Sequence, residues 1–184
     1  MPEKLKILMC FLILTTSIKC QESIDEQLIN SIVQTELQFH KDQQIRITSS
    51  VDSSRLNHHL RIIDSLKESS LLSRNREDTL VLNPQEIQMI EDFFKDMTNL
   101  SIPNIKDLEH IPGDEYVKYL MNRDIDYVVI SVSRPLFIRN NEFGICYFSS
   151  LSGKGNITGP TSISVYKQKD GIWTRTYDLS SGIF

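Results

Sequence analysis

The sequence predicts an α+β fold, with N-terminal helices packed on one face of a C-terminal antiparallel meander sheet of three to five strands. Apolar residues recur at helical spacing through the first two thirds of the chain. From Tyr127 onward the chain is rich in valine and isoleucine and alternates as strands do. This order favours helices and strands in separate layers. We find no repeat and no linker, so residues 21–184 are expected to form a single domain.

The first 20 residues have the three parts of a secretory signal. Lys4 and Lys6 precede an apolar run over residues 7–14, and polar residues follow as far as Cys20. The apolar run is shorter than the roughly 20 residues that span a membrane. We therefore expect residues 1–20 to be a signal peptide and the protein to be exported: periplasmic, anchored at the outer membrane, or secreted. The alternative is that the run is a buried element of the fold.

The cleavage position has three interpretations. Thr15 and Ser17 have small side chains that suit cleavage before Ile18, and cleavage after Cys20 is the second possibility. The third is a lipoprotein acylated at Cys20, which would tether the domain to a membrane surface without embedding it. Bacterial lipoprotein signals usually have a small residue where this chain has Lys19, so we favour a mature protein without the lipid.

Three main helices are expected before the sheet. The first opens with a capping box between Ser23 and Glu26 and ends near residue 40. The second covers residues 54–72, and the third begins after Asn83 with a cap, a proline and a capping glutamate. The third ends near residue 97. Shorter pieces are strands at 45–48 and 79–82, a loop at 101–113 and a short helix at 114–121.

The last third predicts the strands of the meander. Asn140-Asn141 marks one turn, and Asp170-Gly171 is a strong hairpin signal. Alternation in the last strand places Trp173 and Tyr177 on one face, opposite Ile172. The expected strands cover residues 127–133, 136–138, 143–151, 162–167 and 172–177.

Charge and cysteine content exclude several classes of protein. The formal net charge is -4 and no basic stripe is present, so nucleic acid is not an expected partner. A membrane is expected to be contacted only through the signal or a lipid anchor. Of the three cysteines, Cys10 lies in the signal and Cys20 at its end, which excludes a disulfide-dense scaffold. We expect Cys146 to be a small core residue within a strand.

No motif in the chain predicts catalysis, a cofactor or a metal. His58 and His59 are adjacent, so on a helix they point about 100° apart and chelate poorly; we expect surface residues. The glycine-rich segment 153–159 lacks the order of a phosphate-binding loop. His40 and His110 lack ligand spacing. The carboxylates of Asp114, Glu115, Asp124 and Asp126 are a candidate acid–base group, for which solvated side chains are the simpler interpretation.

A series of residues between 127 and 176 carries a family resemblance. It consists of Ser133 to Phe137, then Tyr147, two glycines at 153 and 155, Val165 to Lys167, and Asp170 to Trp173. With these residues the chain resembles small exported bacterial proteins of unknown function. In that group an S-x-P-[IL]-F segment precedes a strand, a glycine-rich turn and a strand ending near K-x-x-G-x-W. The resemblance implies export and this order of strands, and it implies no activity.

Three functions are compatible with the sequence. We favour a non-enzymatic, exported, envelope-associated or secreted binding module for an unknown protein or envelope partner. The second is a small hydrolase or lipid- or ligand-binding protein with a cavity between helices and sheet, lined for hydrolysis by Asp124 or Asp126 and a histidine. The third is an immunity-type protein that neutralises a toxin. The expected binding surface is an exposed aromatic patch, with a core role as the alternative: Tyr147, Tyr166, Trp173 and Tyr177.

Overall fold

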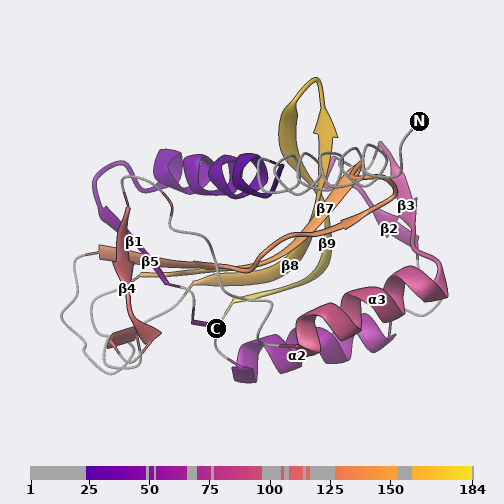
Figure 1. The fold of residues 1–184 in the computed structure, drawn as a ribbon, viewed down its shortest axis with the longest axis horizontal. Helices are drawn as coiled ribbons and strands as arrows, with labels where there is room; N and C mark the ends of the chain where they lie inside the picture. The colour runs from indigo at the N-terminus through magenta and orange to yellow at the C-terminus, as the bar shows by residue number, and fades with distance from the viewer. Residues whose placement is uncertain are drawn as a thin grey trace, which may run out of the picture.

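Helices cover both faces of one sheet (Figure 1). The structure, a computed structural model, describes residues 24–48, 50–51, 53–65, 70–75, 77–96, 105, 108–113, 115–116, 127–152 and 159–183. A helix over residues 24–39, called the N-terminal helix below, lies on one face. On the other face lie α2 (Ser53–Ser65) and α3 (Pro84–Lys95).

The sheet has seven strands and is mixed. Its N-terminal strand β1 lies in the interior and pairs in parallel with β4 and β5, whereas β5, β7, β8 and β9 form an antiparallel series. The short β6 pairs with β7, and β2 and β3 form a separate two-stranded sheet. The bounds are β1 (Gln44–Thr48), β2 (Ser70–Leu72), β3 (Thr79–Val81), β4 (Glu109–Ile111), β5 (Tyr127–Val132), β6 (Leu136–Ile138), β7 (Phe143–Leu151), β8 (Pro160–Lys169) and β9 (Ile172–Ile183).

The predicted mixture of helix and sheet is confirmed, but the simple antiparallel meander is wrong. The five-residue β1 lies between β4 and β5, which adds the parallel pairs. A strand this short carries no local signal of its partners, because pairing is decided by burial across the whole sheet. The prediction that helices pack on one face is also wrong, since both faces of the sheet are apolar and each needs a cover.

Local signals placed the helices well. The N-terminal helix matches its prediction, although its proposed cap Ser23 lies outside the described residues. The capping box of α3 is present: Asn83 Oδ1 accepts from the Glu86 amide at 2.8 Å, and the Asn83 amide donates back to Glu86 Oε2 at 2.9 Å. Helix α2 ends at Ser65, earlier than predicted, because residues 70–72 pair with β3 instead.

The two largest apolar clusters fill most of the space between the layers. On the α2/α3 side, the alternate residues Ile145 and Tyr147 of β7 pack with the two helices. On the other side, Cys146 and Phe148 pack with Leu28 and Ile32 of the N-terminal helix. Cys146 is fully buried, so its predicted core role is confirmed, and burial raises the pKa of its thiol.

The S-x-P-[IL]-F segment, residues 133–137, is hydrogen-bonded to β7 through its serine. Ser133 is fully buried, and its Oγ accepts a hydrogen bond from the Tyr147 amide at 2.9 Å. The Ser133 amide in turn donates to the Tyr147 carbonyl at 3.0 Å. This part of the resemblance therefore has a structural role.

Two bulges interrupt β9. Tyr166 pairs with Arg175 and Val165 pairs with Tyr177, which leaves Thr176 as an extra residue; a second shift leaves Leu179 extra. The bulge at Thr176 reverses the alternation, so Trp173 packs in the cluster under the N-terminal helix and Tyr177 in the cluster under α2 and α3. The prediction that these two side chains share a face is wrong for this reason.

The turn and loop predictions have mixed outcomes. Asp170 and Gly171 both have positive φ, 53° and 78°, as the predicted hairpin turn requires. Asn140 and Asn141 also have positive φ at their predicted turn. Residues 153–158, Asp114, Asp124 and Asp126 lie outside the described residues. Among the described helices, none is long and apolar enough to cross a membrane.

Candidate functional site: a cleft between the N-terminal helix and the sheet

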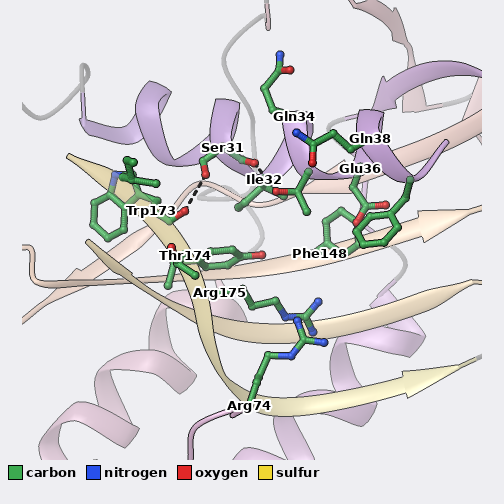
Figure 2. Close-up of a pocket in the computed structure, with 14 residues that line it drawn as sticks. Ser31, Ile32, Gln34, Glu36, Gln38, Arg74, Phe148, Trp173, Thr174 and Arg175 are labelled. Atoms are coloured by element: carbon green, nitrogen blue, oxygen red, sulfur yellow. Dashed lines mark hydrogen bonds between the residues drawn. The ribbon is translucent and has the colours of Figure 1, made fainter. Parts of the chain in front are cut away.

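A cleft of about 550 Å³ lies where the N-terminal helix crosses β8 and β9. This volume is within the range of small-molecule sites, roughly 300–1,000 Å³. Figure 2 shows side chains of the helix at the top, strand residues beneath them, and Arg175 and Arg74 lowest in the view. The lining residues are Ser31, Ile32, Gln34, Thr35, Glu36, Gln38, Phe39, Arg74, Phe148, Tyr166, Ile172, Trp173, Thr174 and Arg175.

The helical wall is attached at one end of the cleft. Ser31 Oγ donates a hydrogen bond to the Trp173 carbonyl at 2.9 Å, drawn as a dashed line in Figure 2. Ile32 packs in the same cluster as Phe148 and Trp173. One turn further along, the helix presents Glu36 to the cleft. The contact at Ser31 therefore fixes the height of the helix above β9.

The strand wall carries a polar cluster that the bulge in β9 creates. Arg175 and Asp178 are three residues apart and would lie on opposite faces of a regular strand, but both lie on the cleft face here. Arg175 Nε donates to Asp178 Oδ1 at 2.8 Å, and Arg175 Nη2 donates to Ser162 Oγ at 3.1 Å. Ser164 Oγ donates to the same carboxylate oxygen at 2.8 Å.

A second arginine enters from the segment after β2. The Arg74 amide donates to the Thr176 carbonyl at 2.9 Å, so the bulge itself holds this residue against β9. Arg74 Nε lies 3.8 Å from Asp178 Oδ2, while Arg175 holds the other oxygen of that carboxylate. Asp178 therefore lies between two guanidinium groups.

Glu36 is the ionisable group on the helical wall. Burial raises the pKa of its carboxyl group; the charge of His40, a hydrogen bond with the Ser150 side chain and the charge of Arg175 act in the opposite direction. Burial is the largest of these effects, so the charged form of Glu36 is less favourable here than it would be in water. The cleft thus faces a carboxyl group that takes up a proton more readily than an exposed glutamate does.

The apolar part of the cleft is divided between floor and rim. Tyr166 and Trp173 are buried, 6% and 4% exposed, and form the floor together with Phe148. Phe39 and Ile172 are 77% and 67% exposed, although both are large apolar residues. These two rim side chains belong to different elements and line the same cleft. They are the exposed apolar surface that a ligand in the cleft would cover.

The four aromatic residues of the predicted binding patch do not form one exposed surface. All four are buried, and the sheet separates them into two pairs. Tyr147 and Tyr177 lie under α2 and α3, whereas Tyr166 and Trp173 line the cleft. The residues that sequence reasoning missed are Arg74, Glu36, Arg175 and Asp178, because they come together only through the bulge and the helix crossing.

The histidines have different positions from those predicted. His59 is fully buried, so its prediction as a surface residue is wrong: Nδ1 is hydrogen-bonded to Ser180 Oγ at 2.6 Å and Nε2 to Thr161 Oγ1 at 2.7 Å. His58 and His110 are exposed, and His40 is near Glu36 with a contact of 3.7 Å. The described residues contain no group of three or more side chains suited to a metal ion.

Comparison of the chain with protein families, with curated proteins and with solved structures finds no match.

Proposed function

We propose that this protein is an exported, non-enzymatic binding protein whose ligand occupies the cleft between the N-terminal helix and β8/β9. The observation that carries the proposal is the cleft itself. It combines an enclosed aromatic floor, a few convergent polar groups and two exposed apolar side chains at its rim. Sites of this composition are typical of small-ligand binding.

The binding role is favoured over hydrolysis by the groups that line the cleft. The hydrolase expected from the sequence needed a histidine with Asp124 or Asp126 in the cavity. Among the described residues, no histidine lines this cleft. Arg175 and Asp178 hydrogen-bond each other and neighbouring serines, an arrangement that orients a bound group and supplies no activated nucleophile.

The proposal is tested by locating bound compounds on the isotope-labelled protein. Nuclear magnetic resonance spectra recorded with a panel of small organic compounds should show shift changes concentrated on the N-terminal helix, β8 and β9. Thr35→Phe places a ring in the mouth of the cleft and should abolish these changes. Asn30→Phe is the matched control, because Asn30 is exposed on the same helix and does not line the cleft. Shift changes elsewhere, or an unaffected Thr35→Phe variant, would contradict the proposal.

Export has its own test. The proposal places the protein in the periplasm, at the outer membrane or outside the cell, because of the signal pattern in residues 1–20. Mass spectrometry of the mature N-terminus from fractionated cells should find a chain that begins near residue 21. A lipid on Cys20 would indicate anchoring, and a cytosolic chain that retains Met1 would contradict export.

A further inference from the structure

The two arginines of the cleft have more hydrogen-bond donors than the protein uses. Arg175 donates through Nε and Nη2, and Arg74 makes a long contact through Nε alone. In the part of the chain that the structure describes, Nη1 of Arg175 and both terminal nitrogens of Arg74 have no hydrogen-bond partner. A guanidinium group presents its donors as a planar fork that matches a carboxylate. The cleft therefore offers unused N–H donors to an acceptor group of a ligand.

The charges around this site favour one negative charge on the ligand. Asp178 neutralises one of the two guanidinium groups, and the carboxyl group of Glu36 is on the opposite wall. A phosphate dianion placed on the arginines would face two carboxyl groups at short range, which costs binding energy. A monoanion has half of that charge, so it meets less repulsion from the two carboxyl groups.

Beyond the polar cluster, the floor and part of the rim of the cleft are apolar. Thr174 and Arg175 follow directly after Ile172 and Trp173 on β9, and Phe39 is at the end of the N-terminal helix. Resting on the binding role proposed above, we propose that the ligand is a small organic monocarboxylate with an apolar body. Its carboxylate binds Arg74 and Arg175, and its hydrocarbon part covers Phe39 and the floor residues Tyr166 and Trp173.

The experiment uses pairs of compounds of nearly equal shape, in which a charged carboxylate is replaced by a neutral primary amide. Trp173 is the sole tryptophan of the chain and forms part of the cleft floor, so its fluorescence reports occupancy. The purified full chain is titrated with 3-phenylpropionate, with octanoate, with the primary amide of each, and with phenyl phosphate. We expect at least one carboxylate to bind about tenfold or more tightly than its amide, and phenyl phosphate to bind more weakly than that carboxylate. The two carboxylates show whether the apolar body is aromatic or aliphatic.

The variant that tests the arginines has a close control. Arg74→Gln should reduce the affinity for the carboxylate to that for the amide. Arg134→Gln should leave it unchanged, because Arg134 has a similarly long carboxylate contact, 3.9 Å to Asp25, and similar exposure, 51% against 58% for Arg74, but does not line the cleft.

The outcomes separate this inference from the binding role. If amide and carboxylate bind the cleft equally, with or without Arg74, the carboxylate specificity is overturned and the binding role stands. Tighter binding of phenyl phosphate replaces a monocarboxylate by a phosphate and also overturns the inference. If none of the five compounds changes the fluorescence and the panel gives no shift changes at the cleft, both are overturned.

Discussion

At the scale of single residues, two ionisable side chains with shifted pKa values lie on opposite faces of the sheet, His59 fully buried and Glu36 half-buried. His59 projects from α2 between two hydroxyl groups, and Glu36 projects from the N-terminal helix toward Arg175 and Ser150. Neither could be predicted from the sequence. His58 and His59 are identical and adjacent, and only the rotation of α2 exposes one and buries the other.

Acid should destabilise the protein through His59. Burial, followed by the charge of His58, lowers the pKa of His59 from 6.5 to about 4. The unfolded chain therefore binds a proton more readily, so the stabilisation is complete above pH 6.5 and is lost as the pH falls toward 4. We expect a loss of roughly 3 kcal/mol over this range from this group.

Urea denaturation at a series of pH values measures this effect. In His59→Gln the free energy of unfolding should be lower at pH 7 and should change less between pH 6.5 and pH 4. His110→Gln, at an exposed position of β4, should keep the dependence of the wild type. An unchanged pH dependence in His59→Gln would show that His59 is not the group responsible.

Glu36 should behave in the opposite sense. Its raised pKa means that its contribution to stability is full below the ordinary value of 4.5 and declines as the pH rises through the raised pKa. Four charged or polar groups face it, namely His40 on its own helix, Ser150 on β7, Tyr166 on β8 and Arg175 on β9. Glu36→Gln should therefore raise Tm at pH 7.5 and have no effect at pH 4.

The control for this prediction is Glu26→Gln, an exposed glutamate on the same helix. Its Tm should match the wild type at both pH values. If Glu36→Gln lowers Tm at pH 7.5, the attraction between Glu36 and Arg175 exceeds the cost of burying the carboxylate, and the expected rise in Tm is contradicted.

At the scale of elements, local and long-range determinants separate clearly. Helix α3 was predicted with its cap because Asn83, Pro84 and Glu86 are neighbours in sequence. The partners of β1 and the bulges of β9 were not, because they depend on residues far along the chain. The positions of the strands in the last third were largely predicted. The face on which each side chain lies was predicted wrongly after Thr176, because the bulge there was not foreseen.

The bulge predicts different effects for two deletions in β9. Thr176 has no partner in the register, so deleting it should retain all side chains on their present faces and cost about 1 kcal/mol for lost hydrogen bonds. Thr174 pairs with Lys167, so deleting it should move Trp173 to the wrong face and cost on the order of 3–5 kcal/mol.

Thermal denaturation of the two deletion variants tests this contrast. The Thr176 deletion should melt in one sharp transition near the wild-type Tm. The Thr174 deletion should melt much lower or lack a cooperative transition, with the fluorescence of an exposed tryptophan. Equal damage by both deletions would mean that Thr176 is needed for more than the bulge.

At the scale of the whole molecule, one sheet joins two helical layers and two cores. The sequence indicated that helices and strands segregate, but it carried no sign of which face each helix covers, because an amphipathic helix fits either face. The cleft was not predicted for the same reason. It exists because the N-terminal helix crosses β8 and β9 on the face that α2 and α3 leave open.

The two layers should unfold together. Leu28, in the N-terminal helix, and Ile90, in α3, are each fully buried on opposite sides of the sheet. Truncation of either to alanine should cost roughly 2–5 kcal/mol in a single transition that fluorescence and circular dichroism report alike. Ile172→Ala, at a side chain that is 67% exposed, should cost far less. Two separate transitions would indicate that the layers are independent.

The position of β9 affects behaviour at high concentration. It is the last strand in the sheet order, and an open strand edge can recruit strands from other molecules into fibrils. Two bulges break the regular row of free amide and carbonyl groups, and the Arg74 amide already occupies the Thr176 carbonyl. The bulges that shape the cleft also make the β9 edge a poor partner for another strand. Concentrated protein should therefore remain dispersed rather than form intermolecular β-structure.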